Sequence, residues 1–163
     1  LDMVRERIPA WAAQIEALAP LGFGHADLVI AVPKAWIDVE TPGDLDAAAA
    51  AFRAAHGHRL RIATKYHRLV REYLRAEGVA DYALIDSQGA TEGTVANGSA
   101  EAIADITSSG DTLRANHLRP LSTPPVLRSE ATLFRARGAD WSADARAAFS
   151  DLAAKIGVDT ARE

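Results

Sequence analysis

The sequence predicts an α/β protein whose strands form a mostly parallel sheet. Short apolar runs of strand length alternate along the chain with longer stretches whose apolar residues recur at helical spacing. Capping residues, glycine and proline stand at the boundaries between these segments. Such alternation is typical of βαβ units, in which helices join parallel strands.

The first half of the chain supplies the clearest elements. A continuous apolar run, Asp-Leu-Val-Ile-Ala-Val, predicts a buried strand that stops at Pro33. Thr41 and Pro42 have the residue types of an N-cap and a first helical position, and Gly57 is suited to end the helix that they begin. In order, we expect a short helix over residues 2–7, strands over 15–21 and 27–32, a helix over 45–55 and a strand over 60–64.

The second half continues the alternation. Leu69, Val70, Tyr73 and Leu74 share one face of a predicted helix, which Gly78 ends. A polar, glycine-containing loop separates the strand expected over 103–106 from the helix expected over 112–117. In order, we expect a helix over 66–76, a strand over 82–85, a helix over 91–95, a strand over 103–106, a helix over 112–117, a long strand over 126–136 and a helix over 140–156.

The composition narrows the classes of function. The net charge is -4, and the only basic cluster, over residues 53–75, is mild, so we expect no nucleic-acid partner. No apolar run approaches the roughly 20 residues of a membrane span. The chain has no cysteine, which excludes disulfides, thiolate metal sites and cysteine nucleophiles and is consistent with a cytoplasmic protein. The five histidines form no set of metal ligands.

The most informative segment runs from Asp105 to Thr112. A short apolar strand ends in an acid, and the hydroxyls of Thr107, Ser108 and Ser109 follow before Gly110 and a helix start. Backbone N–H groups and hydroxyls in such a loop can cradle a phosphate, and Asp105 can accept hydrogen bonds from two ribose hydroxyls. The alternative is a loop whose Ser and Asp residues only cap the helix.

This segment resembles the phosphoribosyl-pyrophosphate signature of the ATP phosphoribosyltransferase family. Four further segments match the same family in the same order: Leu21 to Gly24 followed by 28–33, 61–66, 89–93 and 114–118. The family's N-terminal strand and its Pro-Ser-Lys-Gly-Arg-like phosphate loop have no match here. We therefore expect that the chain lacks its N-terminal part and is inactive by itself.

Two further segments contain candidate substrate-binding residues. Lys65 follows a strand and can neutralise a phosphate, or it is a solvated lysine at a helix start. Thr91 can bind phosphate and Glu92 can bind a hydroxyl or act through a metal, or the two are a capping threonine and a first-turn glutamate. The resemblance places the segment of Lys65 beside the active cleft and brings the functional reading of Thr91 and Glu92 to equal weight with the structural one. No residue of the chain is expected to ligate a metal directly.

The resemblance implies a two-lobed α/β fold like that of type II periplasmic solute-binding proteins. One lobe would combine residues 1–32 with 119–163, and the other would comprise residues 33–118 with the phosphoribosyl-pyrophosphate loop. The reaction implied is transfer of the phosphoribosyl group of phosphoribosyl pyrophosphate to N1 of ATP, with release of pyrophosphate, as the first step of histidine biosynthesis.

The resemblance also implies roles for the residues of the loop and identifies the binding partners. Asp105 would bind the ribose hydroxyls, and the 5-phosphate would lie on Thr107, Ser108, Ser109, Gly110, Asp111 and Thr112, with Asp111 acting through its N–H. Substrate oxygens would hold Mg²⁺. The chain length corresponds to the short form of the family, a catalytic subunit that works in a hetero-oligomer with a histidyl-tRNA-synthetase-like regulatory subunit.

Two alternatives to this function remain open at this point. A non-enzymatic, two-lobed solute-binding module would have the same lobes and take a phosphate-bearing ligand. A type I phosphoribosyltransferase would place two adjacent acids before the loop, but Ala104 precedes Asp105.

Overall fold

The computed structural model describes residues 2–8, 10–87 and 89–158. By its internal contacts the chain divides into two compact units. The smaller unit comprises residues 3–24 with those from 130 onward, and the larger unit comprises residues 25–129. Each unit is described by itself.

The larger unit is built on a mixed sheet with the strand order β4-β3-β5-β2-β6. Strands β3 and β4 are parallel, as are β3 and β5, whereas β2 is antiparallel to β5, β6 and β7. The strands are β2 (Ala26–Pro33), β3 (Leu60–Thr64), β4 (Tyr82–Asp86), β5 (Ala102–Thr107), β6 (Leu118–Pro120) and β7 (Leu127–Ser129).

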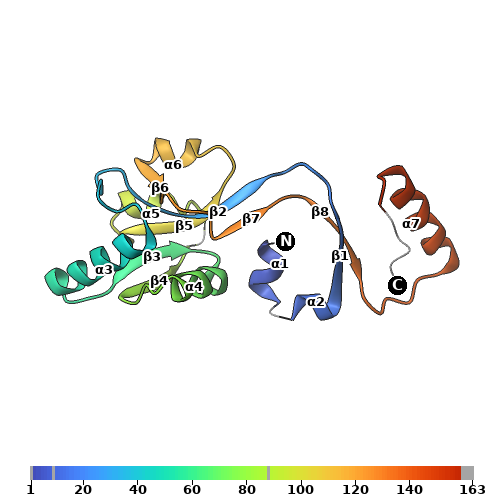
Figure 1. Cartoon of the computed structure of the whole chain (residues 1–163), viewed down its shortest axis with the longest axis horizontal. Coiled ribbons are helices and arrows are strands. Elements are labelled where there is room, and N and C mark those ends of the chain that lie inside the picture. Colours follow the sequence, from blue (N-terminus) through green and yellow to red (C-terminus); the bar gives the residue numbers. More distant parts are fainter. Residues whose placement is uncertain (1, 9, 88, 159–163) are drawn as a thin grey trace. The chain divides into compact units, whose positions relative to one another are not determined.

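Helices cover both faces of this sheet, so the larger unit has three layers. Figure 1 shows α6 on one side of the sheet and α3 and α4 on the other. The helices are α3 (Pro42–His56), α4 (His67–Ala76), α5 (Gly93–Ala96) and α6 (Asp111–Ala115). The expected start of α3 is confirmed: the Thr41 hydroxyl accepts from the Asp44 N–H, and the Asp44 carboxylate accepts from the Thr41 N–H at 2.8 Å.

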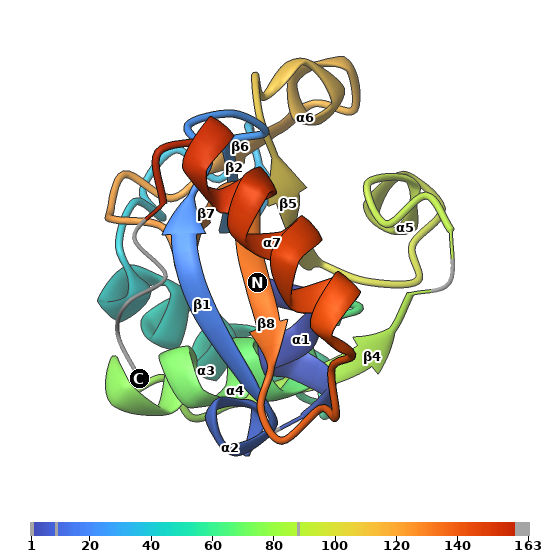
Figure 2. The same ribbon diagram turned by 90° about the vertical axis from the view of Figure 1, so that its right-hand side faces the viewer.

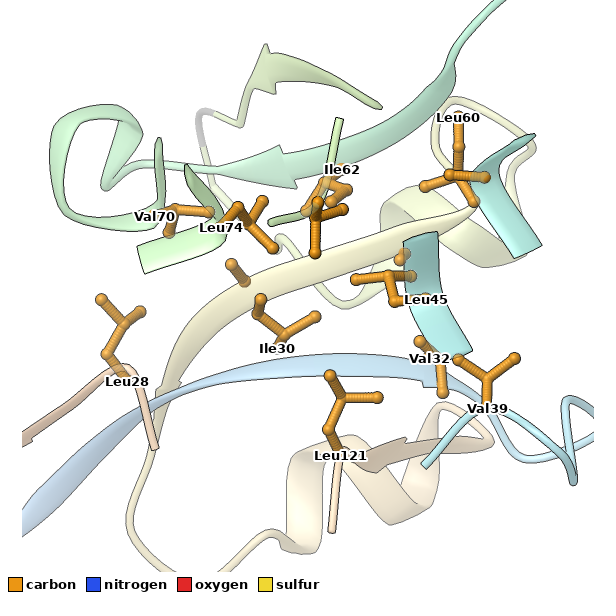
Figure 3. Close-up of a cluster of buried hydrophobic side chains, with 14 of the residues drawn as sticks. Leu28, Ile30, Val32, Val39, Leu45, Leu60, Ile62, Val70, Leu74 and Leu121 are labelled. Carbon is orange, nitrogen blue, oxygen red and sulfur yellow. The ribbon is translucent and has the colours of Figure 1, made fainter. Parts of the chain in front are cut away.

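A separate apolar core fills the space on each face of the sheet. On the α3 and α4 face, Ile30 and Ile62 pack with Leu45 and Leu74, and Figure 3 shows these side chains converging. On the other face, Ile103 packs with Leu113 of α6 and with Leu118. Side chains that alternate along β2, β3 and β5 contribute to both cores, which explains why β2 reads as a continuous apolar run.

The smaller unit is a two-stranded antiparallel ribbon with helices. Strands β1 (Ile15–Pro20) and β8 (Thr132–Ala136) pair from Ile15↔Ala136 to Pro20↔Thr132. The helices are α1 (Asp2–Arg7), α2 (Trp11–Gln14) and α7 (Ala143–Lys155), and α7 lies beside this ribbon in Figures 1 and 2. In α7 the Ser142 hydroxyl caps the N-terminus by accepting from the Ala145 N–H. None of the helices described here is both long and apolar enough to cross a membrane.

The α/β class is confirmed, but the sheet is mixed rather than mostly parallel. The prediction assumed that each strand pairs with the next one through a helical crossover. Instead, β5 lies between β2 and β3, so the β2–β5 pair has no single crossover helix and runs antiparallel.

The long strand expected over residues 126–136 is two strands with different partners. The first, β7, pairs with β2 in the larger unit, and the second, β8, pairs with β1 in the smaller unit. At the break, the Ala131 N–H donates to the Phe23 carbonyl at 2.9 Å and its carbonyl accepts from the Leu21 N–H at 2.8 Å. Alternation within one segment cannot distinguish one long strand from two short strands that serve two sheets.

The contact boundaries at 24/25 and 129/130 differ from the lobe limits expected at 32/33 and 118/119. Here β2 lies wholly in the larger unit, because it pairs along its length with β5 and at its end with β6. The expected lobe limits concern the complete protein, for which they stay a prediction.

A partly buried ion pair joins β3 to the residue that precedes β5. The Arg61 N–H donates to a Glu101 carboxylate oxygen at 2.7 Å, and the guanidinium contacts both carboxylate oxygens and the Gly98 carbonyl. Burial alone would raise the pKa of Glu101, but the hydrogen bonds from Arg61 outweigh it, so the pKa lies below its ordinary value. The folded state therefore prefers the charged carboxylate.

We expect Glu101→Gln to lower the free energy of unfolding by about 1–2 kcal/mol at pH 7, since charge-assisted hydrogen bonds are lost at a half-solvated site. Because the folded pKa is depressed, this contribution is complete above the ordinary value of 4.5 and is lost as the pH falls through the folded pKa. The difference in unfolding free energy between this variant and the wild type, measured by urea unfolding, should be smaller below pH 4.5 than at pH 7. The exposed Glu77→Gln is the control, and a difference independent of pH would contradict the assignment.

Candidate functional site

The carboxyl ends of three parallel strands meet at one edge of the larger sheet. Thr64 of β3 is in register with Ala104 of β5 and with Asp86 of β4. Lys65 directly follows Thr64 and Asp105 directly follows Ala104, so both lie at this same edge. Ligands of α/β proteins bind where the carboxyl ends of strands meet, so the edge is the expected place for a site.

A pocket of about 340 Å³ opens at the end of β5. It brings Glu92, from the segment before α5, onto the same pocket as Asp105 and Thr112. Its lining residues are Glu92, Ile103, Asp105, Ile106, Thr107, Ser108, Ser109, Thr112 and Leu113. Six of the predicted site residues thus share one pocket, although Glu92 lies in a different segment of the chain.

The loop after β5 is held by its own hydrogen bonds. The Gly110 N–H donates to the Thr107 hydroxyl at 2.9 Å, and Gly110 has a φ of 74°. One Asp105 carboxylate oxygen accepts from the Ile106 N–H at 2.9 Å. Asp105 is half-buried, and its other carboxylate oxygen receives no hydrogen bond from the described residues, so it is available to a ligand hydroxyl.

Asp111 keeps its negative charge beside this loop. Its carboxylate accepts a hydrogen bond from the Ser109 hydroxyl at 2.6 Å and pairs with Arg114. The Ser109 hydroxyl, and then Arg114, hold the pKa of Asp111 below its ordinary value. The residue does not line the pocket, and its N–H donates to the Ser109 hydroxyl at 3.3 Å, so the role of this N–H in phosphate binding stays a prediction.

Besides Gly110 and Asp111, two further predicted residues lie outside the pocket lining. Lys65 is exposed at the start of the segment that leads into α4. Thr91 is fully buried, and its hydroxyl accepts from the Ser87 hydroxyl at 3.0 Å while its carbonyl accepts from the Thr94 hydroxyl. Thr91 thus holds the segment that presents Glu92.

Sequence reasoning gave no role to two residues that the structure places at or near this edge. Arg114 pairs with Asp111, and its guanidinium would lie 3.1 Å from a Cβ atom on Gly110. His67 lies 3.5 Å from the Asp86 carboxylate beside the carboxyl end of β4. The signal for Arg114 was its i,i+3 spacing from Asp111, whereas nothing in the sequence pairs His67 with Asp86.

The described residues do not form a metal cage. No group of three or more His, Asp or Glu side chains among them converges to hold an ion. Asp105 and Glu92 share the pocket, and two carboxylates fit an ion held mainly by substrate oxygens, which is how Mg²⁺ is usually bound beside phosphates.

Sequence comparison places the chain among known proteins. The model of the family described as "HisG: ATP phosphoribosyltransferase" matches residues 1–157. An ATP phosphoribosyltransferase of Cereibacter sphaeroides is 69% identical over 157 residues, which cover 96% of this chain and 66% of that relative. This chain belongs to the ATP phosphoribosyltransferase family. Another ATP phosphoribosyltransferase, from Chelativorans sp., is 52% identical over 146 residues, covering 89% of this chain and 64% of the relative.

The membership expected from the motifs is thus confirmed, and the chain spans about two thirds of the length of these two ATP phosphoribosyltransferases. Solved structures agree on the fold. The ATP phosphoribosyl transferase (HisG:HisZ) complex from Thermotoga maritima matches with a TM-score of 0.63 at 20% identity, covering 88% of this chain and 60% of that one. A probable amino-acid ABC transporter extracellular-binding protein from Bacillus subtilis matches with a TM-score of 0.52 at 11% identity, covering 93% and 63%. These likenesses confirm the predicted binding-protein-like α/β fold.

In this member of the ATP phosphoribosyltransferase family, Gly110 is needed for two reasons. Its positive φ costs other residues about 1–2 kcal/mol, and an added Cβ would lie 3.1 Å from an Arg114 guanidinium nitrogen, which would have to shift slightly. We expect Gly110→Ala to lower the free energy of unfolding by about that amount and to weaken binding of a phosphate-bearing ligand in this pocket.

Gly57→Ala is the matched control for Gly110→Ala. Gly57 has a φ of 75° but nothing within 4 Å of its Cβ position. It should lose similar stability in thermal melts and leave ligand binding, measured by calorimetry, unchanged. Equal binding losses in the two variants would show that the loop has no special role.

Proposed function

We propose that the complete protein transfers the phosphoribosyl group of phosphoribosyl pyrophosphate to N1 of ATP and releases pyrophosphate, the first step of histidine biosynthesis. The observation that carries the proposal is the pocket at the end of β5 in a chain of this family. It combines an acid that has a free oxygen with a hydroxyl-rich loop.

The two parts of the pocket suit the two ends of a ribose 5-phosphate. Asp105 accepts hydrogen bonds from the ribose hydroxyls through its free carboxylate oxygen. The 5-phosphate lies on the hydroxyls of the loop and on its backbone N–H groups, with Asp111 contributing only its N–H. Residues 107–112 thus position the sugar by its phosphate while the carboxylate of Asp105 fixes its ring.

The reaction needs positioning more than proton transfer. The lone pair of adenine N1 forms a bond to C1 of the ribose, and the bond between C1 and the pyrophosphate oxygen breaks with its electrons going to pyrophosphate. No strong general base is required, so the contribution of the protein is orientation and charge stabilisation. The Asp105 carboxylate, near the ribose, also stabilises the positive charge that develops at C1.

Three further residues receive supporting roles. Glu92 faces the same pocket and binds a substrate hydroxyl. Lys65, exposed at the same edge of the sheet, neutralises a phosphate of pyrophosphate or ATP. Thr91 is buried, so we assign to it the positioning of Glu92 rather than direct contact. Mg²⁺ bound to the substrate oxygens supplies charge neutralisation for the leaving pyrophosphate.

We further propose that the complete protein is cytoplasmic and works in a hetero-oligomer with a histidyl-tRNA-synthetase-like regulatory subunit. The similar Thermotoga maritima structure is a HisG:HisZ complex, which supports a second subunit. In the complete protein, two lobes would enclose the substrates, one of them formed by residues 33–118.

An assay of the complete protein tests the proposed function. With ATP, phosphoribosyl pyrophosphate and Mg²⁺, it should form N1-phosphoribosyl-ATP and release pyrophosphate in equal amounts. A solute-binding module, the alternative function, would bind a phosphate-bearing ligand without turnover and without Mg²⁺. Binding without any product would therefore reject the enzyme.

A further inference from the structure

Three arginines line a second hollow in the larger unit. Arg59 comes from the loop between α3 and β3, whereas Arg71 and Arg75 lie on α4. The hollow has a volume of about 470 Å³, and its floor includes Val79 and the side of β4. The remaining lining residues are Gly78, Ala80, Tyr82, Ala83 and Leu84.

Among the described residues, these guanidiniums have no acidic partners, whereas neighbouring arginines do. Arg53 pairs with Asp81 at 2.5 Å, and Arg68 pairs with Glu72 at 2.7 Å. None of the described residues forms an ion pair or hydrogen bond with any of the three guanidinium groups, and the hollow has no carboxylate in its lining.

The arrangement of charge on α4 is itself unfavourable. Arg71 and Arg75 are four residues apart on one helix face, a spacing at which like charges destabilise a helix. Arg59 adds a third positive charge to the same hollow. A bound anion would offset this repulsion.

The hollow lies at the opposite edge of the sheet from the pocket of Asp105. Arg59 immediately precedes β3, and Gly78 to Ala80 precede β4, so the hollow is at the amino ends of these strands. The pocket of Asp105 follows β5, which is parallel to β3. The two share no lining residue, so a ligand in the hollow would occupy a second, distinct site.

We propose that this arginine hollow binds a small ligand that carries phosphate groups. Guanidinium groups bind phosphate oxygens through paired hydrogen bonds, and three of them match the charge of a di- or triphosphate. The apolar floor and the half-buried Tyr82 ring can cover an uncharged part of the ligand, and the volume lies within the usual range for small-ligand sites. The inference concerns a different site from the proposed catalytic one and does not depend on it.

The competing explanation is that the arginines only protect the free edge of β4. This strand is the last in the sheet order, and charged side chains beside an edge strand discourage pairing with other chains. Under that explanation, removing the charges would cause self-association and no ligand would bind.

The test uses inorganic pyrophosphate as the probe and the ¹⁵N-labelled chain at constant ionic strength. We expect saturable shifts in the amide signals of residues 78–84 and in the arginine Nε–H signals. Arg71→Gln and Arg75→Gln should each weaken this binding about tenfold, the effect of one lost charge-assisted hydrogen bond. Arg68→Gln, on the same helix but already paired with Glu72, should leave it unchanged.

Three results would overturn the proposal. Perturbation of only the amides of residues 105–112 by pyrophosphate would leave the proposed catalytic loop as the single phosphate site. A loss of binding in Arg68→Gln as large as in Arg75→Gln would indicate diffuse attraction to positive charge. Self-association of the Arg71 and Arg75 variants, with no pyrophosphate bound in the hollow, would indicate edge protection. Arg59→Gln, in a loop outside α4, repeats the test if an α4 variant unfolds.

Discussion

Replacing Asp105 by Asn is expected to lower kcat/KM for phosphoribosyl pyrophosphate about 10- to 100-fold in the complete protein. The substitution removes the charge of a carboxylate that accepts hydrogen bonds from ligand hydroxyls, a loss of about 1.5–3 kcal/mol. Asn keeps an oxygen that can accept from the Ile106 N–H, as Asp105 does at 2.9 Å. The local backbone should therefore survive, and the melting temperature should change little.

Asp38→Asn is the control for this experiment, because it makes the same chemical change at an exposed position outside the pocket. Steady-state kinetics and thermal melting of both variants separate binding from folding. Unchanged kinetics in Asp105→Asn would remove the residue from the site, whereas a parallel loss of stability would assign it a structural role.

Ile62→Ala is expected to lower the free energy of unfolding by about 2–5 kcal/mol. Ile62 is 0% exposed in β3, the strand between β4 and β5, and packs in the core under α3 and α4. Its removal costs the transfer free energy of three carbons and leaves a cavity that rigid neighbours cannot fill. A loss of this size is a large fraction of the stability of an ordinary domain.

Ile37→Ala is a matched control, because the same side chain is 72% exposed there. It should change the free energy of unfolding by no more than about 0.5 kcal/mol. Urea unfolding of both variants measures the two values under one condition. Similar losses in both variants would mean that the described core does not stabilise the larger unit.

Local signals were sufficient wherever the determining residues are contiguous. The start of α3 was predicted from Thr41 and Pro42, and the structure has the capping hydrogen bonds that those residue types make. The loop over residues 105–112 was recognised because strand, hydroxyls, glycine and helix follow one another directly, and all of its residues except Gly110 and Asp111 line one pocket.

Contacts between residues that are distant in sequence could not be predicted from these local signals. Glu92 and Asp105 were separate candidates, and only the fold brings them to one pocket. Thr91 was predicted as a ligand contact, but a hydroxyl at a helix start has the same local pattern whether it faces solvent or, as here, the buried Ser87. The hollow around Arg59, Arg71 and Arg75 likewise has no sequence signature beyond a mild basic cluster.

The residue order of this chain is enough to specify its α/β class, most of its helices and strands, and the character of the loop after Asp105. Apolar periodicity, capping and glycine conformations act over a few residues, so they are visible in a linear sequence. The position of β5 between β2 and β3, and the split between β7 and β8, arise only on folding. Strand neighbours are selected by the simultaneous burial of two cores on opposite faces of the sheet, which depends on residues from the whole of the larger unit.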